Sequence, residues 1–343
     1  MDRVIRLNDR QRNELFTAAA AATGMVPIIL EKDFWVCWTL RELFGLPRIG
    51  EHLIFKGGTS LSKAYRVIQR FSEDIDVSID RDFLGFSGAD APEAATSNKE
   101  RQRRIDALMA ASQQIIRQEL QPALTIAIGQ RLGSVKNWSV EFDESDPDGQ
   151  TLLFHYPSSL PSHASGYIRR SVKIEMGARA DHWPSESKAI TPYVAEQFPE
   201  GFQEPACLVK VLSAERTFWE KATILHAEYH RPAEKASPDR LSRHYYDFDA
   251  LIQCGIDKTA SLDLLSRVSE HKGVFFRSGW AKYSEASPGT LRIAPPDSRQ
   301  KALHDDYAKM REMFFGEVPD FESIIERLST WERSFNAASS HTP

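Results

Sequence analysis

The stretch IFKGGTSLSKAYRVIQRFSEDIDVSID, residues 54–80, decides the fold of this chain. The short apolar run over 52–56 predicts a buried strand, which a pair of glycines ends. Apolar side chains then recur at helical spacing up to Ile68, so a helix is expected from Ser60. Over 74–80 the period changes to two, because Ile75, Val77 and Ile79 alternate with polar residues. This alternation predicts a second strand with one apolar face and one acidic face.

The turn after the first strand has the composition of a phosphate site. Gly57 and Gly58 allow a positive φ and a close approach of the backbone to a ligand. The N-terminus of the helix that follows offers free N–H groups and a positive dipole, which suit a phosphate. The hydroxyls of Thr59 and Ser60 add donors. The alternative interpretation is an ordinary tight turn.

The second strand carries two carboxylates, Asp74 and Asp76, which are two residues apart and therefore point the same way. Two carboxylates in this position cannot both stay ionised cheaply unless a cation lies between them. Mg²⁺ is commonly held by one or two carboxylates together with substrate phosphates. A phosphate cradle beside metal-binding carboxylates predicts nucleotide chemistry, whereas the alternative is a solvated strand face.

The composition of the 343 residues is that of a globular protein, with 41% hydrophobic and 27% charged residues. No run approaches the roughly 20 apolar residues that span a bilayer, and no secretory signal begins the chain, so we expect no membrane partner. The three cysteines cannot form a disulfide framework, which favours the cytoplasm. The net charge of −5 is not typical of a protein that coats nucleic acid, so any RNA contact is expected from local basic patches.

The remaining pattern predicts an α+β fold with a mixed sheet, flanking helices and a helical C-terminal region. Further strands are expected at 124–128, 138–142, 152–156 and 167–176, and helices at 8–22, 28–44, 99–120, 213–229, 242–254, 261–271, 298–315 and 320–335. We expect a first domain over 1–205 and a helical second domain over 206–343, with a frayed tail over 337–343.

Six segments together resemble one known family. They are FKGGTSL (55–61), RFSEDID (70–76), VKIE (172–175), TFWEK (217–221), RHYYD (243–247) and EKDFW (31–35). In their order along the chain, with EKDFW first, they resemble the AbiEii/AbiGii (MenT-like) nucleotidyltransferase toxins, within the DNA polymerase β-like nucleotidyltransferase superfamily. The turn has Gly-Gly-Thr where many superfamily members have Gly-Ser, but threonine keeps the hydroxyl.

The resemblance implies nucleotidyl transfer and assigns roles to residues. Asp74 and Asp76, with Glu175, would hold two Mg²⁺ ions, one to activate an acceptor hydroxyl and one to bind the NTP phosphates and stabilise the leaving pyrophosphate. Lys221 would neutralise charge on the triphosphate, and Asp247 would be a functional carboxylate near it. Nucleotide-binding roles fall on Gly57, Gly58, Thr59, Ser60, Arg70, Ser72 and Lys173.

The residues alone leave simpler interpretations open for several of these positions. Lys173 and Glu175 share a strand face and could form an ion pair. Lys221 could lay its stem along an apolar helix face with its ammonium in water. Asp247 could pair with Arg243 one helical turn away.

The acceptor is expected from the resemblance alone. Some family members extend the 3′ CCA end of tRNA, so we expect a tRNA or other RNA acceptor, and a cognate antitoxin encoded beside this chain. Two other functions stay open: nucleotidylation of a protein or small-molecule hydroxyl, and a non-catalytic module that binds nucleotide or RNA.

Overall fold

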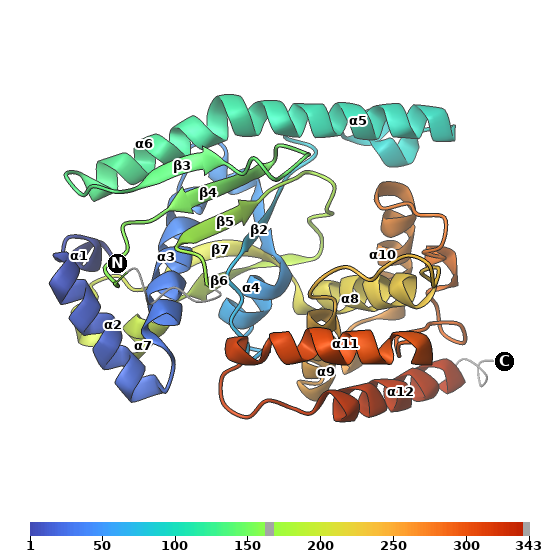
Figure 1. Ribbon diagram of the computed structural model, residues 1–343. Helices are drawn as coiled ribbons and strands as arrows, with labels where there is room; N and C mark the ends of the chain where they lie inside the picture. The colour runs from blue at the N-terminus through green and yellow to red at the C-terminus, as the bar shows by residue number, and fades with distance from the viewer. Residues whose placement is uncertain (162–167, 339–343) are drawn as a thin grey trace. The chain divides into compact units, whose positions relative to one another are not determined.

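A computed structural model describes residues 1–161 and 168–338 (Figure 1). The chain forms two compact units. The first contains Met1–Ala64 and Phe71–Leu212, and the second contains Tyr65–Arg70 and Ser213–Pro343. The sequence predicts two domains that meet near residue 205. Two compact units do not show that each part folds independently, so this boundary stays a prediction. The expected start of a strand at Tyr167 and most of the expected frayed tail lie outside the described residues.

The first unit combines a mixed sheet with helices. Its helices are α1 (Asp2–Ile5), α2 (Asp9–Thr23), α3 (Pro27–Phe44), α4 (Gly57–Lys63), α5 (Asn98–Ile115), α6 (Gln121–Leu132) and α7 (Tyr193–Gln197). Its strands are β1 (Leu53–Lys56), β2 (Ile75–Ile79), β3 (Ser139–Phe142), β4 (Thr151–His155), β5 (Ser171–Glu175), β6 (Ser185–Ile190) and β7 (Cys207–Leu212).

The seven described strands lie in the order β3-β4-β5-β2-β1-β7-β6. The β2 strand pairs antiparallel with β1 and parallel with β5, so it lies inside the sheet. Its apolar residues Ile75, Val77 and Ile79 are buried, as the alternation predicts. The α+β class with flanking helices is therefore confirmed. Figure 1 shows α3 lying against the sheet and α6 running beside β3.

The helix after the glycine pair differs from the expectation. It begins at Gly57 rather than Ser60 and ends at Lys63, so it has only seven residues. Arg66 adopts a left-handed φ of 55°, which residues that carry a Cβ rarely take. A helix cannot continue through such a residue, and the helical spacing up to Ile68 was misleading for this reason.

The left-handed backbone at Arg66 therefore interrupts the helical conformation between α4 and Arg70. Tyr65–Arg70 belongs to the second unit, so the chain leaves the first unit after α4 and returns to it at Phe71, before β2.

Two other parts of the sheet unit correct the sequence prediction. The run at 124–128 is not a strand but part of α6, where Leu124, Ile128 and Leu132 are buried one helical turn apart. Strands β6 and β7 were not predicted at all. The expected helix over 99–120 is found as α5, followed by a π-helical turn over Ile116–Leu120 that leads into α6.

The core of the first unit is centred on α3, in which nearly every side chain is buried. Trp35 packs against Phe154 and Tyr156, and Trp38 packs against Phe154, with ring centroids 5.6–5.9 Å apart. Within the described residues, no single helix is long and apolar enough to span a membrane. By length and composition alone, the pair α2 and α3, bent by 111°, passes that test together.

The second unit is helical, as expected for the C-terminal region. Its helices are α8 (Ala214–Tyr229), α9 (Ser242–Gln253), α10 (Leu262–Phe275), α11 (Asp297–Lys309) and α12 (Phe321–Ala337). Helix α9 packs against α8, α11 and α12. Phe218 of α8 stacks on Phe248 of α9 with ring centroids 4.5 Å apart, which makes an aromatic centre for this unit.

Candidate functional site

The glycine turn and the acidic strand meet at Gly57 and Asp76. Gly57 has a φ of +79°, which L side chains rarely adopt. A Cβ placed on this glycine would lie 2.0 Å from Oδ2 of Asp76 and 2.7 Å from its Cγ. The Asp76 carboxylate therefore lies directly against the backbone of the turn, and only glycine leaves room for it.

Asp76 also lies between two neighbouring strands. It pairs with Lys56 of β1 and with Glu175 of β5 in the sheet register. Asp74 lies two residues earlier, just before β2. Burial, together with the negative charges of Glu73, Asp76 and Glu175, raises the pKa of the Asp74 carboxyl to about 6, while Lys32 opposes the rise. The sheet thus gathers negative charge beside the glycine turn, as the sequence predicted.

The hydroxyls of the turn bind protein atoms in this structure. Thr59 is fully buried, and its Oγ1 contacts the Ser72 hydroxyl at 2.9 Å and donates to the carbonyl of Asp74. Ser60 donates to the carbonyl of Gly57 at 2.8 Å. These bonds tie α4 to the segment that leads into β2. No side chain caps the N-terminus of α4 at Lys56.

Lys173 and Glu175 form an ion pair on β5, which is the simpler interpretation that the residues left open. The pKa of the Lys173 ammonium is raised because its bond to Glu175 outweighs its burial. Among the described residues, no group of three His, Cys, Asp or Glu side chains is arranged to hold a metal ion. Two carboxylates still suit Mg²⁺, because substrate phosphates and water complete its oxygen ligands. Asp74 and Asp76 therefore fit the Mg²⁺ ion that the sequence predicts.

Lys32 is a residue of this site that the sequence reasoning did not assign. Its ammonium lies 2.5 Å from Oε2 of Glu73, the residue before Asp74, and its side chain is almost completely buried. The signal was present in the sequence, because Glu31, Lys32 and Asp33 are three consecutive charges between two apolar runs of a helix. Such charges are rarely buried without partners.

A second cluster of predicted residues lies within the helical unit. Arg70 donates to Asp247 through Nε at 2.7 Å and through Nη2 at 2.8 Å. Lys221 donates to Oδ2 of the same carboxylate at 2.7 Å. All three side chains are buried. The structure therefore brings Arg70, Lys221 and Asp247 together, although Arg70 and Asp247 are 177 positions apart in the sequence.

Two cations of this cluster, Arg70 and Lys221, share the Asp247 carboxylate. Arg70 and Lys221 hold the pKa of Asp247 well below its usual range, although burial acts in the opposite direction. Burial lowers the pKa of Lys221, and the nearby Arg70 lowers it further. Asp247 thus pairs with Arg70 and Lys221. The Lys221 ammonium is buried and does not reach into water along the helix.

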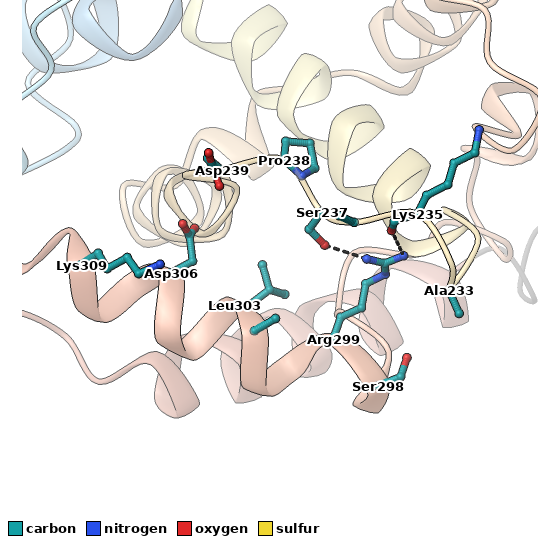
Figure 2. Close-up of a pocket in the computed structure, with 12 residues that line it drawn as sticks. Ala233, Lys235, Ser237, Pro238, Asp239, Ser298, Arg299, Leu303, Asp306 and Lys309 are labelled. Atoms are coloured by element: carbon teal, nitrogen blue, oxygen red, sulfur yellow. Dashed lines mark hydrogen bonds between the residues drawn. The ribbon is translucent and has the colours of Figure 1, made fainter.

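A separate pocket of about 360 Å³ lies in the helical unit, between the 233–239 segment and α11. Figure 2 shows Arg299 bonded to the Ser237 hydroxyl, at 2.7 Å, and to the carbonyl of Lys235, at 3.0 Å. Its lining includes none of the site residues that the sequence predicted. This pocket is therefore distinct from both clusters.

Comparison with known proteins agrees with the motifs. A solved structure, the nucleotidyltransferase toxin MenT4 from Mycobacterium tuberculosis H37Rv, is similar over 95% of this chain and 98% of its own, with 15% identity and a TM-score of 0.47. No curated protein sequence matches the chain. The model of the nucleotidyl transferase AbiEii toxin family, type IV toxin–antitoxin system, matches residues 38–331. The chain therefore belongs to the AbiEii family of nucleotidyltransferase toxins.

Proposed function

We propose that this toxin is a Mg²⁺-dependent enzyme that transfers a nucleotide monophosphate from an NTP to an RNA acceptor, the 3′ end of tRNA, and releases pyrophosphate. We place this activity in the cytoplasm. The observation that carries the proposal is the Asp76 carboxylate packed against the Gly57 turn, with Asp74 beside it. Membership of a toxin–antitoxin family implies an antitoxin partner, and we propose that this partner is encoded beside the toxin.

The sheet unit supplies the groups that the proposal needs for a nucleotide. Asp74 and Asp76 would hold the metal ion, and Glu175 could join them if it released Lys173. When bound, Mg²⁺ neutralises phosphate charge and stabilises the leaving pyrophosphate. The backbone of Gly57 and Gly58 would bind phosphate, because a turn without Cβ atoms admits a ligand closely. The hydroxyl of Thr59 already bonds within the protein, so its contribution would be to position the turn.

The helical unit supplies two buried cations beside one carboxylate. Arg70 and Lys221 both pair with Asp247. We propose that Lys221 stabilises negative charge on the triphosphate, with Asp247 holding its ammonium in place. Fixed charges of this kind act without reorganisation during the reaction.

The Asp76→Asn variant tests the metal assignment. We expect it to fold with at least the stability of the wild type, because it removes a negative charge from a cluster of carboxylates. We expect it to lose incorporation from labelled NTP, a fall of at least about 100-fold. Asp80→Asn is the matched control, since Asp80 is half-buried like Asp76 and lies one residue beyond β2, outside the predicted site. Full activity in Asp76→Asn would refute the assignment.

One assay separates this function from its two rivals. Pyrophosphate release is measured with each of the four NTPs, with and without tRNA, and the labelled product is identified. Label on RNA supports the proposal. Label on a polypeptide or small molecule, without RNA dependence, supports the rival acceptor. Nucleotide binding without Mg²⁺-dependent pyrophosphate release supports a non-catalytic module.

A further inference from the structure

Helix α3 carries three consecutive charged side chains that are all buried. The exposed fractions are 0% for Glu31, 2% for Lys32 and 2% for Asp33. Successive residues of a helix point about 100° apart, so the three side chains reach three different segments of the sheet unit. Each finds its own partner there.

Lys32 reaches the segment before β2. Its Nζ lies 2.5 Å from Oε2 of Glu73, and both side chains are buried. Glu73 is followed directly by Asp74 and then by β2, which carries Asp76. The pair therefore fixes the backbone at the point where the acidic strand begins.

Asp33 reaches the end of α4. Its Oδ1 lies 2.7 Å from Nζ of Lys63, and its Oδ2 accepts the N–H of Tyr193 at 2.7 Å. Lys63 is the last residue of α4, whose first residue is Gly57. The Lys63 ammonium also lies 3.5 Å from the centre of the Tyr193 ring. These contacts fix the short helix that carries the glycine turn.

Glu31 holds a third segment. It accepts hydrogen bonds from the hydroxyls of Ser158 and Ser159, at 2.6 and 2.8 Å, and from the N–H of Ser159 at 2.7 Å. This segment follows β4. One turn of α3 therefore fastens three separate pieces of the sheet unit.

Stability alone does not explain so many buried charges. Replacing a buried ion pair by apolar side chains of similar volume is often neutral or stabilising. Ion pairs differ from apolar contacts because they fix the direction and distance of the groups that they join. The ion pairs of Lys32 and Asp33 end on the two segments that form the proposed nucleotide site, which points to a role in its geometry.

We propose that Lys32 and Asp33 are positioning residues of the nucleotide site, in which Lys32 holds the start of β2 through Glu73 and Asp33 holds α4 through Lys63. The inference rests on the proposed function, because that function makes the Asp74–Asp76 pair and the Gly57 turn parts of one site. Neither residue is assigned contact with the substrate.

The test removes each ion pair as a whole, so that no buried charge is left unpaired. The double variants are K32M/E73Q and D33N/K63M. The control is R81M/E93Q, which removes the Arg81–Glu93 pair beyond the other end of β2. Two properties are measured: hydrogen exchange of peptides covering 57–63 and 71–76, and Mn²⁺ binding in the presence of ATP, followed by electron paramagnetic resonance of the free ion. Circular dichroism first shows that each variant is folded.

We expect faster exchange in 71–76 for the first variant and in 57–63 for the second. We expect both to bind Mn²⁺ at least about tenfold more weakly, as is typical when the residues that orient metal ligands are changed. The control should match the wild type in both properties.

Wild-type Mn²⁺ affinity in the two double variants would overturn the inference, whether or not exchange is faster, because the pairs would then support the fold alone. Absence of Mn²⁺ binding by the wild type would instead overturn the metal assignment of the proposed function. Failure of the inference is therefore seen in the double variants, and failure of the proposed function is seen in the wild type.

Discussion

At Gly57 the backbone takes a φ of +79° and lies within van der Waals contact of the Asp76 carboxylate. We predict that Gly57→Ala loses nucleotidyl transfer, because the new Cβ would force Asp76 to move. The strained φ alone costs about 1–2 kcal/mol of stability. The added clash should make the loss of unfolding free energy larger, as measured by urea denaturation.

Gly85 offers a matched control for that substitution. Its φ is +83°, close to that of Gly57, but a Cβ there would meet nothing within 4 Å. Gly85→Ala should therefore show the cost of the φ alone and keep full activity. Equal activity in the two alanine variants would contradict the role given to the Gly57–Asp76 contact.

At the scale of whole elements, the sequence predicted the strand–turn–helix–strand unit because its parts are adjacent in the chain. The period of two in β2 predicted which residues form its acidic face and which form its apolar face. In the structure β2 is a strand that pairs with β1 and β5. The pattern failed at α6, because Leu124, Ile126 and Ile128 imitate the alternation of a strand. In the structure Ile126 is 60% exposed, whereas Leu124 and Ile128, which are one helical turn apart, are buried.

Strands β6 and β7 were missed for a related reason. The edge strand β6 has the sequence SESKAI and lacks an apolar face, while β7 carries Leu208, which is 72% exposed. The Arg70–Lys221–Asp247 cluster could not be predicted as ion pairs, because the partners come from distant parts of the sequence. Only the family motifs suggested that Lys221 and Asp247 act near each other.

The link between α4 and β2 gives a prediction at this scale. Thr59→Val keeps the shape of the side chain but removes its bonds to Ser72 and Asp74, each worth about 1 kcal/mol. We expect a lower kcat with little change in KM for the NTP, because the hydroxyl positions the turn. Steady-state kinetics check this.

Thr39→Val is the control, since the Thr39 hydroxyl is also buried and donates to a carbonyl, that of Trp35, at 2.7 Å. It should lose similar stability and keep its activity. A rise in KM alone for Thr59→Val would contradict the positioning role and favour a direct bond from Thr59 to phosphate.

In the whole molecule, His226 and Asp74 make the free energy of unfolding depend on pH in opposite directions. Burial lowers the pKa of His226 to about 4. Its Nδ1 accepts the N–H of Arg292 at 3.0 Å, and its Nε2 lies 3.1 Å from the carbonyl of Lys282, which fits a neutral ring. The unfolded chain binds this proton at about pH 6.5. Stability from His226 is therefore lost as the pH falls from about 6.5 towards 4.

Asp74 acts in the opposite direction when no metal is bound. Its pKa is about 6 in the folded protein and about 3.9 in an unfolded chain. The folded state therefore holds the proton more tightly, and the stability that this provides is lost as the pH rises from about 3.9 to 6. Between about pH 4 and 6 the two groups partly cancel.

Removing each group separately should change the pH dependence in opposite ways. We predict that His226→Asn flattens the rise of unfolding free energy between about pH 4 and 6.5, because it removes the group that favours folding at higher pH. Asp74→Asn should steepen the same rise, because it removes the opposing group. Urea denaturation in EDTA at several pH values measures the slope of the unfolding free energy against pH for each variant. The slopes are compared rather than the absolute free energies, because a lost hydrogen bond lowers the free energy at every pH. Slopes equal to that of the wild type in both variants would show that neither group changes its proton affinity on folding.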